Sequence, residues 1–553
     1  MIKKFKTLLK KYEIDGYIIP KNDEFFGEYA FPNRLKTATN FSGSAGFALI
    51  TKLTNYLFVD GRYLIQSKIE CGKNFKIVEI PYSYPKNILN YNKIKKVGYD
   101  PKLFTSLTLE RYFGFKFQLI SIKENFVDSF ILEKKKKINS FFKIEDKVVG
   151  EKVASKINRL HKILKKKGSS NIFISAPENV AWLLNIRGHD NPNSPIPNCY
   201  LFLNKNGKYY LIADKKKVKN LIKDKKISSN QIINPNDFKL FIKKQKKGKI
   251  LIDRKTCSLF FEHIIKTKFK ISINGDPIYL MKSIKNKMEI KNMLHSHLYD
   301  GLALTKFIYW IKEINKKRIT EFEAQNKLEE FRKKNKNYLY PSFDTIAGSG
   351  PNSAIIHYRT SKKTNRKIKK SDIFLCDSGG QYKYGTTDVT RTICFSKPKQ
   401  NIKNIFTKVL KGHIAVVSAD LKKNFNGKLI DVLARKNLIK SGLDYRHGTG
   451  HGVGFFLNVH EGPHAISKFN TIKIREGMIV SNEPGYYKKG EFGIRIENLI
   501  YVKKNNNKLT FENLTLAPIE KDLINFEILN TKEKNYLFKY HLMVYSKLSK
   551  YLN

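Results

Sequence analysis

Two aspartates that are eleven residues apart, Asp377 and Asp388, lie in a segment whose pattern is typical of a β-hairpin. An apolar run at 373–376 leads into the first aspartate, a glycine-containing turn follows near 382–385, and a stretch rich in Thr and Val carries the second. This pattern predicts that the two carboxylates face each other on adjacent strands, about 5 Å apart. Like charges repel at that distance unless a cation lies between them. On their own, the two aspartates fit equally well a pair that caps an exposed turn.

Further along the chain, other segments supply side chains of the kind that bind metals. Four of the twelve histidines fall between positions 447 and 464, in a stretch whose glycines argue against a helix. This excludes a zinc-protease helix with two histidines on one face and favours a tight turn or strand edge. Glu483 precedes a proline, and the alternating strand at 493–498 places Arg495 and Glu497 on the same face.

Together, these segments offer two aspartates, two glutamates and one histidine, and no cysteine. This donor set consists mostly of oxygen and carries too much negative charge for one ion. It favours a pair of divalent ions such as Mn, Zn or Co, about 3.5 to 4 Å apart, over a structural zinc site.

With these motifs, the chain resembles the pita-bread metallopeptidases, and among them the Xaa-Pro aminopeptidases (aminopeptidase P). The motifs that carry the resemblance extend from the beginning of the chain to its end. They are residues 41–46, 59–63, 181–188, 348–358, 377–392, 447–463, 483–487, 493–498 and 509–519.

The resemblance implies a role for each candidate site residue. The implied metal ligands of two divalent ions, expected to be Mn²⁺ with Zn²⁺ or Co²⁺ as alternatives, are Asp377, Asp388, His451, Glu483 and Glu497, the last as a bridge. Glu483 is also expected to shuttle a proton. The residues expected to hold the substrate and handle protons around the metals are His357, His447 and His460. The resemblance further associates Arg62 with the substrate.

At 553 residues the chain is too long for one core, and two or three domains are expected. The resemblance implies two creatinase-like α/β domains, residues 1–143 and 144–283, followed by a pita-bread α+β metallopeptidase domain, residues 284–553. A carboxy-terminal extension is expected from about residue 505. A lysine run at 134–137 and a basic segment at 282–287 mark the joints, and a long helix is predicted from Met288 to about Ile314.

Each of the first two domains opens with a basic amphipathic helix that is followed by a strand, at 17–20 in one and at 172–175 in the other. This likeness suggests that the two domains are related. Two positions depart from the family pattern. Tyr384 stands in the hairpin turn where Asp is frequent, and Arg446 stands before His447 where Gly is frequent. Neither position is a ligand, and we expect Tyr384 to be neutral for the site.

The net charge of +57 would ordinarily indicate nucleic acid or an anionic membrane as a partner. Here the lysines are spread through nearly every segment, and no nucleic-acid-binding motif accompanies them. We therefore expect no nucleic-acid partner. Because no run of eighteen apolar residues exists and the amino terminus is charged throughout, we expect neither a membrane span nor a signal peptide. Five scattered cysteines favour reduced thiols in the cytoplasm.

We therefore expect a metal-dependent aminopeptidase that releases the amino-terminal residue from peptides with proline in the second position. A homodimer would be usual for the family. One alternative is a prolidase that acts on Xaa-Pro dipeptides, because the same ligands permit it. The other is a catalytically inactive peptide-binding module, against which the retention of every ligand position counts.

Overall fold

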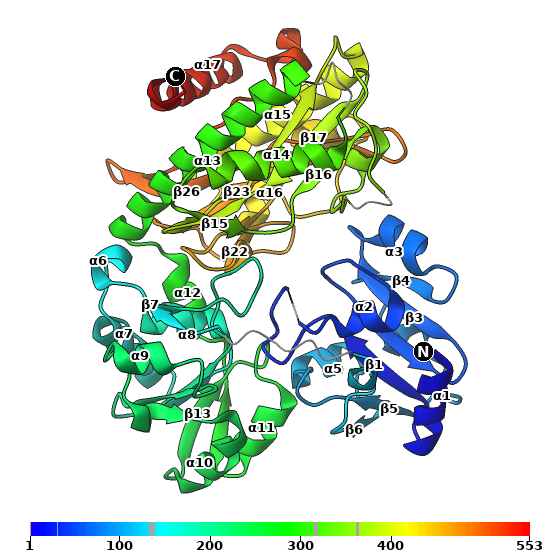
Figure 1. Cartoon of the computed structure of the whole chain (residues 1–553), viewed down its shortest axis with the longest axis vertical. Helices are drawn as coiled ribbons and strands as arrows, with labels where there is room; N and C mark the ends of the chain where they lie inside the picture. Colours follow the sequence, from blue (N-terminus) through cyan, green and yellow to red (C-terminus); the bar gives the residue numbers. More distant parts are fainter. Residues whose placement is uncertain (1, 30, 132–138, 315–318, 361–363, 553) are drawn as a thin grey trace. The chain divides into compact units, whose positions relative to one another are not determined.

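The computed structural model describes residues 2–29, 31–131, 139–314, 319–360 and 364–552, and the lysine run at 134–137 lies outside them. The chain forms two compact units (Figure 1). The first comprises Met1–Asp146 and Glu151–Ile278, and the second comprises Lys147–Gly150 and Tyr279–Asn553. The predicted boundaries at 143/144 and 283/284 stay predictions, and each unit is described by itself below.

The first unit contains two mixed sheets with the same topology. Their strand orders are β4-β3-β2-β1-β5-β6 and β12-β11-β10-β8-β13-β14. The strands are β1 Gly16–Pro20, β2 Phe47–Thr51, β3 Asn55–Asp60, β4 Lys76–Ile80, β5 Lys96–Tyr99, β6 Gln118–Ser121, β8 Asn171–Ile174, β10 Tyr200–Leu203, β11 Tyr209–Ile212, β12 Ile232–Ile233, β13 Gly248–Ile252 and β14 Phe269–Ile273. Each order holds two antiparallel pairings, β1-β2-β3 or β8-β10-β11, flanked by parallel ones. This identity of topology supports the suggestion that the two halves are related.

A basic helix precedes the first strand of each sheet, as predicted. Helix α1 (Ile2–Lys11) buries Phe5 and Leu9, one turn apart, and helix α7 (Val153–Lys166) buries Leu160 and Leu164 at the same spacing. The other helices of this unit are α2 Arg34–Thr39, α3 Leu64–Cys71, α4 Pro85–Ile88, α5 Ser106–Phe113, α8 Pro177–Leu184, α9 Lys219–Lys223, α10 Phe238–Lys244 and α11 Leu259–Lys266. Helices α6 Asp146–Val149 and α12 Ile278–Ser283 lie at the joints between the units.

The second unit is built from several small antiparallel sheets. Their strand orders are β16-β17-β20, β15-β18-β19, β22-β21-β23-β26-β27 and β24-β25. The strands are β15 Tyr338–Pro341, β16 Ile346–Ser349, β17 Ile373–Ser378, β18 Gly380–Tyr382, β19 Gly385–Thr386, β20 Val389–Cys394, β21 Gly450–Gly452, β22 Glu461–Ile466, β23 Ile479–Asn482, β24 Gly485–Lys488, β25 Phe492–Arg495, β26 Asn498–Asn505 and β27 Lys508–Asn513.

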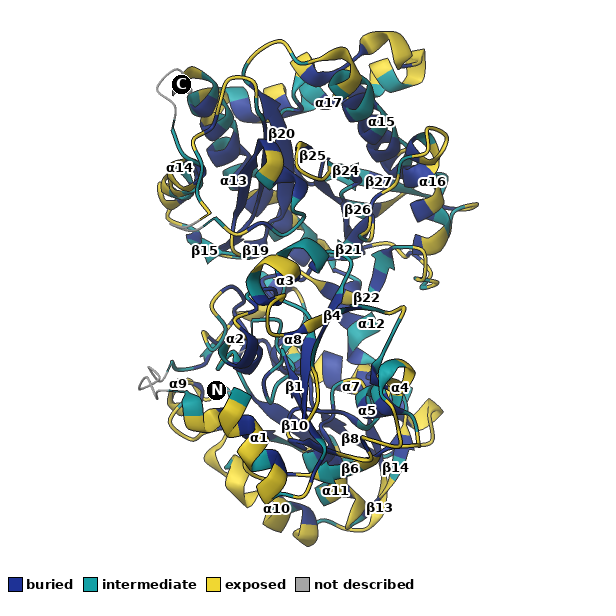
Figure 2. Ribbon diagram, turned by 90° about the vertical axis from the view of Figure 1, so that its right-hand side faces the viewer, coloured by how far each residue is buried: buried dark blue, intermediate teal, exposed yellow. Residues whose placement is uncertain are grey.

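Helices enclose these sheets on two sides. They are α13 Lys287–Ile314, α14 Glu321–Lys333, α15 Gln400–Val417, α16 Gly427–Ile439 and α17 Thr531–Leu548, and α13 confirms the predicted long helix. Figure 2 shows the buried strands between α13 with α14 on one side and α15 with α16 on the other. Helices α13 and α14 pack Phe307 and Leu328 against Phe374 of β17. Helices α15 and α16 pack Val416 and Ala434 against Val480 of β23. The sheets between the two helical layers carry the site described next.

Two general expectations concern the thiols and the membrane. All five cysteines are free, which agrees with the expected reduced thiols, and all five are buried. Within the described part of the chain, no helix combines the length and the apolar composition that a membrane span requires.

Candidate metal centre

The two aspartates lie on neighbouring strands, but they are not directly opposite each other. Strands β17 and β20 pair with Asp377 across from Thr390, and Asp388 lies just before β20. The carboxylates are therefore offset diagonally by two residues, and the predicted direct pairing is wrong. The cause is the segment between them, where β18 and β19 form a tighter hairpin that pairs with β15 in another sheet. The predicted turn near 382–385 is confirmed, because Tyr382 pairs with Gly385.

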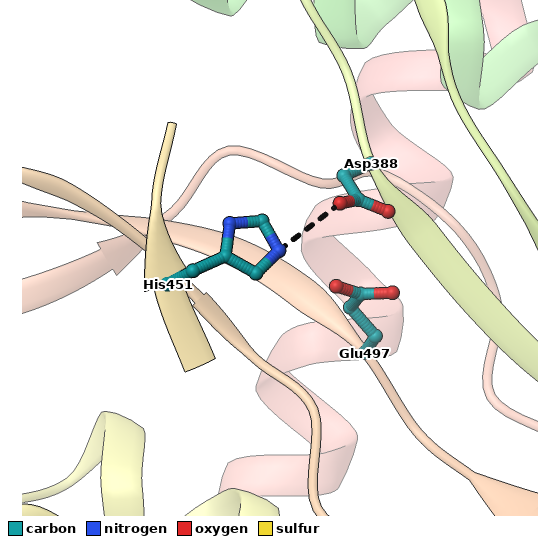
Figure 3. Close-up of side chains that lie close together, drawn as sticks. All are labelled: Asp388, His451 and Glu497. Carbon is teal, nitrogen blue, oxygen red and sulfur yellow. Dashed lines mark ion pairs between the residues drawn. The ribbon is translucent and has the colours of Figure 1, made fainter. Parts of the chain in front are cut away.

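His451 lies in the middle of β21 and points toward the carboxylates (Figure 3). Its Nδ1 lies 3.0 Å from the carbonyl oxygen of Gly452, which only accepts, so Nδ1 carries the proton. Its Nε2 then faces Asp388 Oδ2 at 3.4 Å and Glu483 Oε1 at 3.5 Å. The glycines permit close packing, as predicted. A Cβ at Gly450 would lie 1.9 Å from the carbonyl oxygen of Ser481 on β23.

The two glutamates approach from separate strand ends. Glu483 follows β23, and the Ser481 hydroxyl donates to its Oε1 at 3.0 Å while it accepts from the His451 amide at 2.9 Å. Glu497 lies between β25 and β26 and accepts from the Thr390 hydroxyl at 2.7 Å. One ligand atom from each of Asp388, His451 and Glu497 lies within 4.8 Å of the other two (Figure 3).

The strand predicted at 493–498 alternates as expected, but it is divided. Ile494 and Ile496 lie in the apolar core, whereas Arg495 and Glu497 face the site. The chain changes sheets after Arg495, because β25 pairs with β24 and β26 pairs with β23.

Arg495 and Tyr487 link Asp377, one of the predicted ligands, to His447. The guanidinium of Arg495 donates to Asp377 Oδ2 at 2.6 Å and to the Tyr487 hydroxyl at 2.6 Å. That hydroxyl also lies 2.9 Å from Nε2 of His447. The second carboxylate oxygen of Asp377, Oδ1, is buried and has no hydrogen-bond partner among the described residues.

The electrostatics of this cluster fit divalent cations. Burial and the neighbouring charges of Asp377 and Glu483 raise the pKa of Asp388 to about 6, against the hydrogen bond from His451. Burial and the same kind of repulsion raise the pKa of Glu497 well above its ordinary value. Burial lowers the pKa of His451, but the hydrogen bond to Asp388 and the charges of Glu483 and Asp388 outweigh this effect and raise the pKa to about 9. Carboxylates that repel one another lie here beside Asp377 Oδ1, the oxygen without a hydrogen-bond partner among the described residues. This arrangement indicates a site where cations bind.

A second group of possible ligands, Cys394, Glu520 and Asp522, is explained without a metal. The ammonium group of Lys312 lies 2.9 Å from both oxygens of Glu520 and 3.2 Å from Asp522 Oδ2. Lysine thus supplies the cation there.

The remaining predicted site residues lie in three places. His460 is exposed in the loop before β22, and its ring lies 4.3 Å from that of His451. His357 lies in the turn after the 3₁₀ helix Gly350–Ala354. Arg62 belongs to the first unit, where it donates to both carboxylate oxygens of Asp60 at 2.8 Å. Its substrate contact stays a prediction.

The two departures from the family pattern, Tyr384 and Arg446, are not members of the cluster formed by Asp388, His451 and Glu497. The ring of Tyr384 packs edge-on against Phe456, with ring centroids 5.7 Å apart, in the loop between β21 and β22. Arg446 is exposed.

Several residues that hold the predicted ligands in place were given no role from the sequence. Thr390 lies two residues after Asp388, and Arg495 lies two residues before Glu497. Because alternate residues of a strand share a face, this spacing already placed Arg495 beside Glu497, and the same rule could have revealed Thr390. Ser481 and Tyr487 had no such signal, since their partners are on other segments.

Glu321, at the start of α14, was also missed, and it holds the turn that carries His357. It is buried and accepts from the amide and hydroxyl of Ser349 at 2.7 and 2.9 Å and from the Tyr358 hydroxyl at 2.9 Å. It also accepts from the Asn352 side chain at 3.1 and 3.0 Å. One carboxylate therefore anchors the chain on both sides of His357.

If the protein is the metallopeptidase that the sequence predicts, replacing Glu321 with glutamine is expected to lower kcat about tenfold and to leave the metal content unchanged. The groups of Ser349, Asn352 and Tyr358 that contact Glu321 all donate to its carboxylate. The amide N–H groups of a glutamine would face these donors, so the turn would shift. Steady-state kinetics and elemental analysis measure both quantities. The control is Glu323→Gln, because Glu323 caps the same helix through Thr320, and glutamine preserves that role. A Glu321→Gln enzyme with the parent kcat would contradict the role of this anchor.

Comparisons with known proteins cover nearly the whole chain. A model of the metallopeptidase family M24 matches residues 291–504, and one of its C-terminal region matches residues 507–553. Two models of the creatinase/prolidase N-terminal domain match residues 1–129 and 133–289. The chain is similar to a probable Xaa-Pro aminopeptidase P of Laccaria bicolor, with 37% identity over 99% of this chain and 90% of that one. It is also similar to Xaa-Pro aminopeptidase 1 of Dictyostelium discoideum, with 36% identity over 99% and 92%.

Solved structures agree with these relatives. The crystal structure of X-prolyl aminopeptidase from Caenorhabditis elegans, described as a cytosolic enzyme with a di-nuclear active site, has 30% identity and a TM-score of 0.88 over 98% of this chain and 92% of that one. A prolidase of Thermococcus sibiricus has 28% identity and a TM-score of 0.54. The match includes 98% of that prolidase but only 67% of this chain. The predicted fold, two creatinase-like domains and a pita-bread domain, is confirmed. The chain therefore belongs to the Xaa-Pro aminopeptidase P family of M24 metallopeptidases.

Proposed function

We propose that this protein is a dinuclear metalloaminopeptidase that removes the first residue from peptides with proline in the second position. The observation that carries this proposal is the convergence of Asp388, His451, Glu483 and Glu497 in one cluster, in which Asp388 and Glu497 are buried, with Asp377 held beside it by Arg495. The full-length similarity to enzymes named Xaa-Pro aminopeptidase supports the substrate class.

The ligands that we propose for the two ions are Asp377, Asp388, His451, Glu483 and Glu497, with Glu497 as the bridge. When bound, the ions would polarise the peptide carbonyl and lower the pKa of an attacking water. We assign the proton transfer to the leaving nitrogen to Glu483, whose carboxylate is oriented by Ser481.

The histidines are proposed to handle the substrate. His460 is exposed beside His451, a position suited to donate a hydrogen bond to the developing oxyanion, and we assign the same role to His357. His447 would contact the substrate from the hydrogen-bonded chain that runs through Tyr487 to Arg495 and Asp377. Because proline offers no amide N–H, recognition must rest on ring packing and on the free amino group.

Manganese, the homodimer and the cytoplasm are finer parts of the proposal. Four carboxylates and one imidazole suit Mn²⁺, with Zn²⁺ or Co²⁺ as alternatives. For the dimer, α17 exposes Phe538, Leu542 and Tyr545, whose spacing puts an apolar stripe on one face. The free cysteines and the cytosolic description of the Caenorhabditis elegans enzyme support the cytoplasm.

The two alternatives differ from this proposal in what they predict for catalysis. A prolidase would need the same ligands, but the prolidase of Thermococcus sibiricus matches only two thirds of this chain. A binding module would have no reason to keep the complete donor set together with Thr390, Ser481 and Arg495 that orient it.

A comparison of substrates of different length tests this proposal. The metal-supplemented enzyme is expected to hydrolyse an Xaa-Pro-Xaa tripeptide at least about tenfold faster, in kcat/KM, than an Xaa-Pro dipeptide. Arg62→Ala is expected to reduce kcat/KM for longer peptides more than for short ones, because a remote contact supplies binding energy that short peptides never use.

Arg159→Ala is the control for Arg62→Ala, since Arg159 is a more exposed arginine of the same unit that pairs with Glu151. Equal or faster hydrolysis of the dipeptide would assign the protein to the prolidases. Hydrolysis of neither peptide by protein with both metals bound would favour the binding module.

A further inference from the structure

Arg391 lies on β20 directly after Thr390, and its side chain points away from the metal centre into the protein. Its Nε donates to the Pro518 carbonyl at 2.8 Å, and its Nη1 donates to the carbonyls of Thr390 at 2.8 Å and Glu497 at 2.6 Å. Its Nη2 donates to Asn498 Oδ1 at 2.8 Å, to the Ala517 carbonyl at 2.8 Å and to the Tyr540 hydroxyl at 3.0 Å.

Arg391 is only 2% exposed, and every N–H group of its guanidinium has an acceptor. None of these acceptors is a carboxylate. A buried cation is costly unless its hydrogen bonds are satisfied, so the carbonyl oxygens around Arg391 are held where they are. Two of these carbonyls belong to Thr390 and Glu497, and the side chains of the same two residues bond each other at the metal centre.

Of the other acceptors, Asn498 belongs to β26, whereas Pro518, Ala517 and Tyr540 belong to the carboxy-terminal extension. Tyr540 is a buried residue of α17, and its hydroxyl donates to the Ala517 carbonyl at 2.7 Å while it accepts from Arg391. Helix α17 packs into the same apolar core as Ile494 and Ile496, the two residues that alternate with Arg495 and Glu497. The extension thus contacts the side of the segment 494–497 that carries Ile494 and Ile496, and Glu497 lies on the opposite side.

We propose that the carboxy-terminal extension is a positioning element for the metal centre, with Arg391 and Tyr540 as the residues that connect it to Glu497. The guanidinium fixes the Glu497 carbonyl against residues 517–518, and Tyr540 fixes those residues against α17. The direction of the Glu497 carboxylate then depends on a helix that begins 34 residues later in the chain. This inference rests on the proposed dinuclear centre.

Binding of Mn²⁺ to metal-free, full-length protein tests the inference, measured by calorimetric titration and followed by kinetics at increasing Mn²⁺. Tyr540→Phe removes one hydroxyl and leaves the ring in place. We expect it to weaken the binding of one ion about tenfold, to lower kcat at limiting Mn²⁺ and to recover most of kcat at saturating Mn²⁺, with KM unchanged. Arg391→Lys keeps the charge and loses the planar fork, so it is expected to have the same effects to a larger extent.

Tyr536→Phe is the matched control. Tyr536 lies one turn earlier on α17. Within the described residues, the one hydrogen bond of its hydroxyl is accepted from the Asn513 side chain, at 3.2 Å. It should bind Mn²⁺ like the parent. Parent-like Mn²⁺ affinity in Tyr540→Phe would overturn the inference, and so would an equal loss in Tyr536→Phe. If the parent itself failed to bind two ions, the proposed metal centre would be wrong, which is a different outcome.

Discussion

Asp388→Asn is expected to lower turnover at least about a hundredfold and to reduce the metal content from two ions per chain to fewer. Asp388 is buried, and its oxygen lies 3.4 Å from His451 within a cluster of like charges. Asparagine keeps the shape of the side chain but removes a charged ligand. The fold should persist, because loss of one charge relieves repulsion in the metal-free cluster. We therefore expect the Tm of the metal-free variant to equal or exceed that of the parent.

Added Mn²⁺ provides a second measurement on the same two proteins. A ligand that binds only the folded state raises its Tm, so the parent should gain stability with Mn²⁺ and the variant should gain much less. The matched control is Asp522→Asn, the same change at a carboxylate that is 66% exposed and pairs with Lys312. Asp522 also belongs to the other possible ligand group. Full activity in Asp388→Asn, or metal loss in Asp522→Asn instead, would contradict the dinuclear assignment.

The surroundings of Glu497 and His451 could be predicted from the sequence, because they depend on local patterns. The alternation at 493–498 predicts that Arg495 and Glu497 share a face, and the glycines around His451 predict a close approach between strands. Both are local consequences of side-chain direction and of a missing Cβ, and both are observed.

The register of the aspartate hairpin could not be predicted in the same way. The offset between Asp377 and Asp388 arises because β18 pairs with β15, about forty residues upstream, so that the chain between the aspartates leaves their sheet. The division of the strand at Ile496 likewise depends on two different partners, β24 and β23. Such pairings are set by distant segments, which a local pattern does not encode.

Residues that would act through the predicted ligands were the hardest to predict from the sequence. Arg391 is one of many basic residues in this chain, and nothing around it in the sequence distinguishes it from the others. Its acceptors lie at 390, 497–498, 517–518 and 540, so its role exists only after the fold brings these segments together. Glu321 is similar, because its partners lie about thirty residues further along the chain.

His451→Ala is expected to lose at least one ion and nearly all activity, whereas His460→Ala should keep both ions and lose part of kcat. The two rings lie 4.3 Å apart, so distance alone does not separate their roles. Hydrogen bonding does. His451 has Nδ1 bonded to the Gly452 carbonyl, which leaves Nε2 toward Asp388 and Glu483 as a ligand should be oriented.

His460 is exposed at the end of its loop, where it can reach a substrate, and His357→Ala is expected to behave like His460→Ala. Elemental analysis and kcat, measured on the same preparations, separate the two classes. The control is His263→Ala, an exposed histidine of α11 in the first unit, which should match the parent in both. The imidazole that holds the ion must be the one whose removal empties the site. If His460→Ala lost metal and His451→Ala kept its full metal content, the two assignments would therefore be exchanged.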